Sequence, residues 1–136
     1  MQISIVWFIF VKNINKAMNQ RMIKFLAWDI DLKRMSTIVH LGDGIVCFPN
    51  DTLPIAFCAT RTERFVFRQY TGLNDKDGRE IYEGDITKDI EGGIGVVEFK
   101  ATSFRAVDGL GWDNLAYPDE CGVIGNIYEN PELLQQ

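Results

Sequence analysis

Two carboxylates flank a glycine at Glu83-Gly84-Asp85, and this is the pattern in the chain that most resembles catalytic machinery. In a glycosidase or nuclease such a pair could transfer a proton or hold a metal ion. That chemistry needs one carboxyl group in an apolar site and a partner across a cleft, which adjacent turn residues rarely provide. We therefore expect Asp85 to accept hydrogen bonds from backbone amides and to fix the turn before Ile86. A carboxylate-metal enzyme using Glu83 and Asp85 is the weakest of three hypotheses.

A second acidic pattern, Asp75-Lys76-Asp77-Gly78, matches part of a calcium-binding EF-hand loop. Positions one and twelve of that loop would be Leu73 and Gly84, and neither side chain carries an oxygen ligand. The sequence therefore predicts a hairpin turn here and no metal site.

The remaining nucleophiles and metal ligands are sparse. The cysteines Cys47, Cys58 and Cys121 are odd in number and form no Cys-x-x-Cys pair, so neither a disulfide framework nor a zinc site is indicated. His40 is the only histidine and is expected to be an ordinary strand or loop residue. We expect no cofactor, no enzyme activity and a reducing, cytoplasmic setting.

The charge is divided unevenly along the chain. The net charge of −5 combines seven Lys/Arg against four Asp/Glu in residues 1–61 with seven against fifteen in residues 62–136. An acidic surface repels phosphate, whereas nucleic-acid-binding domains usually have a basic face. Direct nucleic-acid binding is therefore not expected, and the arginines around residues 61–68 are read as the solvated ends of a strand, with phosphate binding as the alternative.

Aromatic rings next to turns are a further resource for binding. Most aromatic residues should fill the core, but a partly exposed ring at a turn could stack on a base, a peptide or a small ligand. The candidate binding set joins these rings to the available cations: Arg61, Arg64, Arg68, Tyr70, Tyr82, Lys100 and Trp112. If neighbouring subunits brought these residues together, they would form a pocket for a small nucleotide or signalling molecule.

Short apolar runs alternating with turn signals predict the elements that position these residues. Strands are expected at 23–28, 35–39, 65–67, 81–82, 85–90, 94–99, 104–107 and 123–128. Two short strands or irregular segments are expected within 41–60. The turns depend on Gly72, Gly78, Gly84, Asp85 and Gly93, with Gly92-Gly93 supplying a positive φ. Asn130-Pro131 predicts a short C-terminal helical turn capped by Asn130. This pattern favours an all-β fold, a small SH3-like barrel with hairpins.

Residues 1–21 differ from the rest and contain a nearly continuous apolar run at 3–11. The run is too short to span a bilayer and lacks the flanks of a signal peptide. Three interpretations remain open: an extra strand, a segment that buries on a partner subunit, or translation from an upstream start codon. The second makes a homo-oligomer the expected state, because exposed residues such as Trp7 and Phe8 favour association.

Three phrases together resemble the YopX family of phage and prophage proteins. They are 23–29, the run Thr71-Gly72-Leu73 through Ile81-Tyr82-Glu83-Gly84-Asp85-Ile86, and 123–134. The resemblance covers nearly all of residues 22–136, fitting poorly at 41–60 and before Met22. It implies a phage or prophage origin, expression in a bacterial cytoplasm, a β-barrel domain at 22–136 and no established enzyme activity.

The first hypothesis is therefore a non-enzymatic phage accessory protein that binds a host protein or regulator through exposed loops. In one variant its acidic surface imitates nucleic acid towards a DNA-binding host factor. The alternative is the oligomeric protein that sequesters a small nucleotide or signalling molecule.

Overall fold

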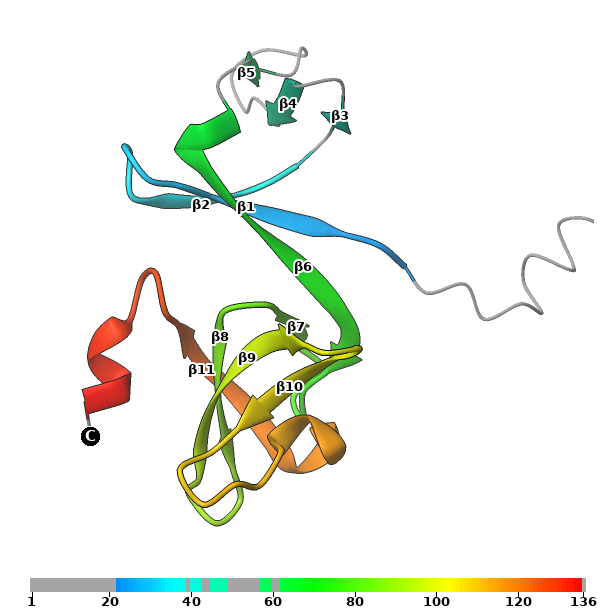
Figure 1. Cartoon of the computed structure of the whole chain (residues 1–136), viewed down its shortest axis with the longest axis vertical. Helices are drawn as coiled ribbons and strands as arrows, with labels where there is room; N and C mark the ends of the chain where they lie inside the picture. Colours follow the sequence, from blue (N-terminus) through cyan, green and yellow to red (C-terminus); the bar gives the residue numbers. More distant parts are fainter. Residues whose placement is uncertain (1–21, 39, 43–44, 49–56, 60–61, 136) are drawn as a thin grey trace, which may run out of the picture.

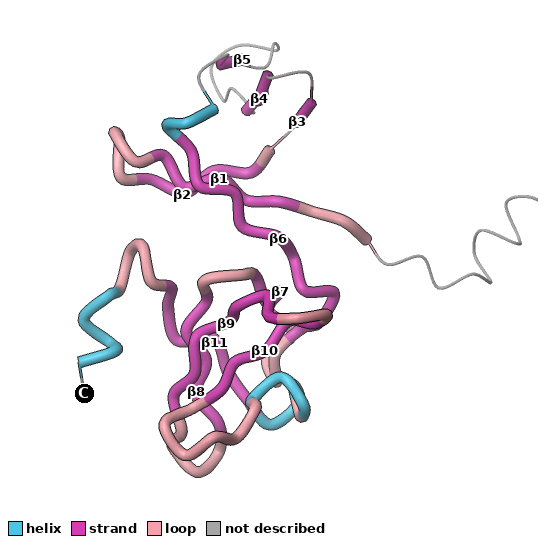
Figure 2. Tube along the Cα trace, in the orientation of Figure 1, coloured by secondary structure: helices cyan, strands magenta, loops and turns pink. Residues whose placement is uncertain are grey.

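The computed structural model describes residues 22–38, 40–42, 45–48, 57–59 and 62–135. Strands dominate these residues, and the helices among them are short 3-10 turns (Figure 2). The all-β fold predicted from the sequence is confirmed. The N-terminal extension, residues 1–21, lies outside the described residues.

The described strands form three antiparallel sheets (Figure 1). The first has the order β2-β1-β6-β7, from Arg34–Thr37, Phe25–Asp29, Phe65–Asn74 and Glu80–Tyr82. The second has the order β10-β9-β8-β11, from Ser103–Val107, Ile94–Lys100, Asp85–Asp89 and Cys121–Asn126. A smaller sheet joins β3 (His40–Gly42), β4 (Ile45–Phe48) and β5 (Phe57–Ala59), where two strands were expected. The 3-10 turns are η1 (Thr62–Arg64), η2 (Asn114–Ala116), η3 (Pro118–Glu120) and η4 (Pro131–Gln135).

The long strand β6 connects the two larger parts of the fold. Its first half pairs with β1, for example Phe67 opposite Ala27, and its second half pairs with β7. The sequence predicted a strand only over residues 65–67, but β6 continues to Asn74 because its second half pairs with β7, with a shift in register between Tyr70 and Asn74. Gly72, with a φ of 89°, lies in this irregular segment, where glycine adopts a left-handed conformation without strain.

Strands β7 to β11 curl into a half-barrel below β1 and β2 in Figure 1. Its core consists of Ile81, Val97, Ala106, Leu115 and Cys121, all buried. A separate, smaller cluster contains Ala27 and Phe65. Alternation along the strands sends four of these side chains inward, as expected for small β-structures that are solvated on one face, and η2 contributes Leu115.

Three hairpin turns of the half-barrel share one design: residues 75–79 (the Asp75 turn), 89–93 (the Asp89 turn) and 108–112 (the Asp108 turn). In each, Oδ1 of the first aspartate accepts hydrogen bonds from the backbone N–H groups two and four residues later, at 2.7–2.9 Å. In each, the fourth residue is a glycine with positive φ: 80° at Gly78, 95° at Gly92 and 91° at Gly111. The aspartate satisfies amides that the turn leaves unpaired, and glycine accepts the left-handed conformation. Asp-x-x-Gly is thus the sequence signature of these turns.

Side chains also close the outer edges of three strands. Asp85 accepts the amide of Tyr82 in β7 at 2.7 Å, and Asp113 accepts that of Ala106 in β10 at 2.9 Å. In β11, Oδ2 of Asp75 accepts the amide of Val123 at 2.9 Å. Amides that are already bonded cannot pair with a strand from another molecule.

Several expectations about turns need correction. Gly92 alone supplies the positive φ of the Asp89 turn. Gly93 is needed for a different reason, because there is no room for a side chain at that position. A Cβ on Gly93 would lie 2.4 Å from Oδ2 of Asp108 and 2.6 Å from Oδ2 of Asp89. Ile90 belongs to the turn and not to β8. The predicted C-terminal helical turn forms as η4, but the side-chain oxygen of Asn130, expected to cap it, accepts the amide of Asn126 in β11 at 3.3 Å.

Candidate functional site

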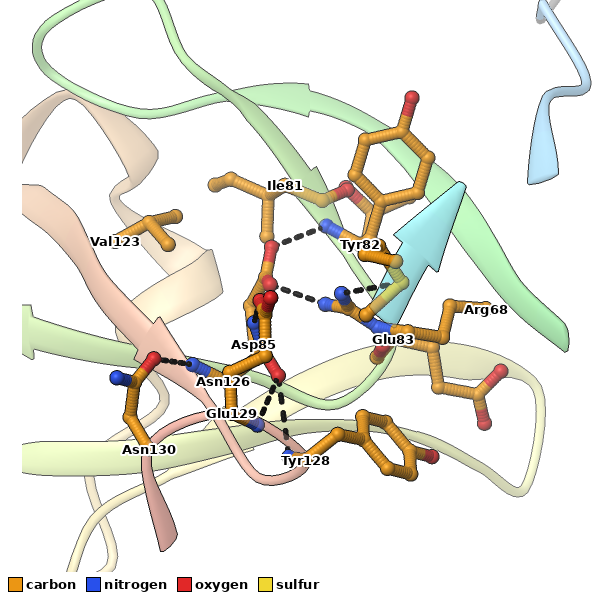
Figure 3. Close-up of polar contacts among 12 residues, drawn as sticks. Arg68, Ile81, Tyr82, Glu83, Asp85, Val123, Asn126, Tyr128, Glu129 and Asn130 are labelled. Carbon is orange, nitrogen blue, oxygen red and sulfur yellow. Dashed lines mark hydrogen bonds and ion pairs between the residues drawn. The ribbon is translucent and has the colours of Figure 1, made fainter. Parts of the chain in front are cut away.

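Arg68 and Asp85 form a buried ion pair where β6 crosses the half-barrel (Figure 3). Arg68 is 2% exposed; its Nη2 donates to Asp85, and its Nε donates to the carbonyl of Glu83 at 2.7 Å. Its Nη1 lies 3.7 Å from the sulfur of Met35, and the ring of Tyr128 is 5.7 Å from the guanidinium. These contacts tie β6 to the turn before β8.

The protonation behaviour of Asp85 follows from this setting. Burial raises the pKa of Asp85, while the Arg68 guanidinium and the Tyr82 amide oppose that rise. One carboxylate oxygen is bonded to Arg68 and the other to the Tyr82 amide. A carboxylate engaged at both oxygens holds a turn in place and is poorly placed to exchange protons with a substrate.

The tyrosines predicted to be partly exposed are buried. Tyr70 and Tyr82 pack against each other with ring centroids 5.5 Å apart. Burial, followed by the nearby Glu80 carboxylate, raises the pKa of Tyr82, whose hydroxyl donates to Glu80 at 2.7 Å. Glu80 also forms an ion pair with Lys24. Each residue is only 9% exposed, because the paired strands β6 and β7 place Tyr70 opposite Tyr82 and bring the two rings together.

The predicted cations have separate partners. Arg64 donates to both oxygens of Asp29, at 2.7 and 2.6 Å. Arg68 binds Asp85, and the exposed Lys100 is 3.8 Å from Glu98. Arg61 lies outside the described residues. The described part of the chain therefore does not bring the candidate binding residues into one pocket.

A cleft of about 620 Å³ lies beside the Arg68–Asp85 pair. Its walls include Leu26 and Met35 from the first sheet and Ile124 and Asn126 from β11. Within the described residues, no buried side-chain nitrogen or oxygen lacks a hydrogen-bond partner, and no group of three or more His, Cys, Asp or Glu could hold a metal ion. No buried polar atom described in this cleft is therefore left without a hydrogen-bond partner, although accessible polar side chains such as Arg79 and Glu129 also line it.

Large apolar side chains are exposed instead at the end of the half-barrel. Ile90 in the Asp89 turn is 71% exposed, and Leu110 and Trp112 in the Asp108 turn are 83% and 69% exposed. We call these three residues the loop-tip surface. Both turns lie at the lower end of the half-barrel in Figure 1.

The two turns of the loop-tip surface touch each other. Oδ2 atoms from Asp89 and Asp108 both approach Gly93, and Nδ2 of Asn114 donates to the carbonyl of Gly93 at 3.2 Å. Each turn is closed internally by its own aspartate, and the contacts at Gly93 place the two turns side by side.

The Asp75 turn shows that an Asp-x-x-Gly turn does not need exposed apolar residues. It places Lys76 and Asp77 at the positions that Ile90 and Glu91 occupy in the Asp89 turn, and Asp77 corresponds to Leu110 in the Asp108 turn. Polar residues satisfy the same geometry there. The sequence analysis found Trp112 but missed Ile90 and Leu110, although apolar residues inside an Asp-x-x-Gly turn were a signal that could have revealed them.

Comparison with known proteins shows that the chain is similar to a solved structure and to one protein family. It is similar to the crystal structure of protein EF1440 from Enterococcus faecalis, with 28% sequence identity and a TM-score of 0.62 over 85% of this chain and 99% of that chain. Among curated proteins, none matches this sequence. Within the described residues there is also no helix long and apolar enough to span a membrane. The family model for the YopX protein matches residues 24–135, nearly the whole chain, and the chain therefore belongs to the YopX family.

Proposed function

We propose that this protein is a non-enzymatic phage accessory protein that binds a host protein through the loop-tip surface. The observation that carries the proposal is the exposure of Ile90, Leu110 and Trp112 on two turns that touch each other. Exposed apolar residues that cluster mark interaction sites, and tryptophan is among the residues that contribute most to protein interfaces.

The distribution of charge supports binding over catalysis. Several carboxylates of the half-barrel accept hydrogen bonds from backbone N–H groups in turns, among them those of Asp75, Asp85, Asp89 and Asp108. They stabilise the frame, and their oxygens are turned towards amides. This also weighs against nucleic-acid mimicry, since a mimic needs its carboxylates exposed along one face.

The sequestering alternative and the homo-oligomer stay predictions. Both need residues from neighbouring subunits or from residues 1–21, and the contacts of the described chain favour neither. The loop-tip surface favours a protein partner directly, because it is already assembled within one chain.

The test replaces the tips with the residues of the Asp75 turn. The variant Ile90→Lys, Leu110→Asp, Trp112→Arg takes Lys76, Asp77 and Arg79 as its templates, so the turns keep their geometry. A tagged wild-type protein should retain a defined bacterial protein in stoichiometric amount, and the triple variant should weaken that complex by about 30-fold or more, as loss of one hot spot of about 2 kcal/mol implies.

A matched control is Leu134→Asp, an exposed apolar residue on η4 at the C-terminal end. This variant should bind like the wild type, and thermal denaturation should show that all three proteins are folded. The proposal is wrong if the wild type retains no partner or if the triple variant binds as well as the wild type.

A further inference from the structure

We infer that the partner offers the loop-tip surface an apolar recess bordered by lysine or arginine, so the ligand is a cationic protein surface. The inference rests on the proposed function and names the chemistry of its partner. It follows from the charge carried by the two turns themselves.

All ionisable residues within the two turns are acidic. Asp89, Glu91 and Asp108 belong to residues 89–93 and 108–112, and neither segment contains lysine or arginine. Lys88, just before the Asp89 turn, is the nearest cation in sequence, with its Cε 3.8 Å from the Cβ position of Gly92. The two turns that carry the apolar tips therefore bear a net negative charge of their own.

Glu91 is the carboxylate best placed to meet a partner. It lies next to Ile90 at the tip of the Asp89 turn, and it is exposed. Asp89 and Asp108 each use Oδ1 to hold their turns and direct Oδ2 towards Gly93. A partner that buries Ile90 must also approach Glu91, and a positive side chain there would compensate the loss of water around the carboxylate.

The same charges disfavour two other occupants. A bacterial membrane surface is anionic and would repel the acidic turns, although apolar tips alone could insert into lipid. A second copy of this chain would bring the same acidic turns against each other, and the whole chain carries a net charge of −5. Electrostatic complementarity thus selects a basic protein over lipid and over self-association.

Zero-length carbodiimide coupling tests the inference, because it joins a carboxylate to a lysine amine only when the two are in contact. The probe is the protein that the tagged wild type retains, purified and mixed with the whole chain. We expect coupling of Glu91 to a lysine of that protein. Asp77, which occupies the same position in the Asp75 turn and is also exposed, should not couple and serves as the internal control.

A binding measurement complements the coupling. Glu91→Lys should weaken the complex about tenfold, and Asp77→Lys should leave it unchanged. Raising the salt from 0.1 M to 1 M should also weaken it, since the Debye length falls from about 10 Å to about 3 Å.

The outcomes separate this inference from the proposed function. If the triple tip variant loses the partner but Glu91 neither couples nor affects affinity, the partner is not cationic and the inference is wrong while the proposed function stands. Sedimentation of the wild type with phosphatidylglycerol vesicles, or a self-complex abolished by the triple variant, would likewise overturn it. If the tips do not affect binding at all, both proposals fail.

Discussion

Arg68 of β6 and Asp85 of β8 are buried against each other, and each fixes part of the turn between them. The guanidinium donates to the carbonyl of Glu83 while the carboxylate accepts the amide of Tyr82. One ion pair thereby sets the path of residues 82–85 and attaches β6 to the half-barrel.

Removing either member of this pair should be costly. Arg68→Met or Asp85→Leu alone leaves an uncompensated buried charge and should lower the free energy of unfolding by about 3–5 kcal/mol. The double variant Arg68→Met, Asp85→Leu should lose much less than the sum of the two single losses. Urea denaturation of all four proteins measures this, and additive losses would show that the pair is not energetically coupled.

The Asp108 turn and the Asp75 turn should respond differently to asparagine. Asp108 uses only Oδ1 for its turn amides, so Asp108→Asn keeps both hydrogen bonds and should change stability by well under about 1 kcal/mol. Asp75 also accepts the Val123 amide through Oδ2, and Asp75→Asn places an amide donor there. That variant should lose about 1.5–3 kcal/mol in thermal or chemical denaturation. Equal effects at the two positions would contradict this account.

Gly93 and Gly109 form a matched pair for a test of space. Alanine at Gly93 would bring its Cβ within 2.4 Å of Asp108 and should destabilise the protein by about 1–3 kcal/mol. Alanine at Gly109 meets no atom of the described residues within 4 Å, and it should be neutral or stabilising by about 0.4–1 kcal/mol. Melting temperatures compare the two variants, and a tolerated Gly93→Ala would mean that the carboxylates can move aside.

Ala101 should be improved by glycine. It has a φ of 59°, a left-handed conformation that costs an L-residue about 1–2 kcal/mol, whereas glycine adopts it freely at a cost of about 0.5–1 kcal/mol in chain entropy. Ala101→Gly should thus raise the free energy of unfolding by roughly 0.5–1 kcal/mol. Ala116→Gly in η2 is the control and should lower it. If both variants lose stability, the turn does not carry this strain.

Acid should destabilise the protein in a defined window. The hydrogen bond from Arg64 holds the pKa of Asp29 below its ordinary value of 3.8. Burial raises the pKa of Asp75, but the N–H groups of Val123, Arg79 and Asp77 outweigh it and bring the pKa below 3.8. Because both carboxylates bind protons less readily when folded, their stabilisation is complete above about pH 4 and is lost as pH falls through the lower folded-state values.

Urea midpoints measured from pH 7 down to pH 3 should fall steeply below about pH 4. Asp75→Asn should make that fall shallower, and Asp77→Asn, at an exposed position of the same turn, should leave its slope unchanged. A midpoint that stays constant down to pH 3 would contradict the lowered pKa values.

The strands were largely predictable from the sequence, and the contacts of the candidate site were not. Alternation and glycine turns located β8, β9 and β10, because these hairpins are local in sequence. The burial of Tyr70 and Tyr82 depends on pairing between β6 and β7, and Arg68 meets Asp85 across 17 residues of chain. The sequence also could not show why residue 93 must be glycine, since the side chain that limits its space, Asp108, lies on another turn.

In the edge strands β7, β10 and β11, aspartate side chains occupy outer backbone amides, and this limits which parts of the fold can change to bind a different partner. The outermost amides of Tyr82, Ala106 and Val123 are bonded within the chain, so an added strand cannot pair with them. Under the proposed function, the side chains at the turn tips would then determine which target is bound. An Asp-x-x-Gly turn constrains its first and fourth residues and leaves the second and third free. Relatives could therefore exchange targets by substituting a few tip residues while inheriting the same frame.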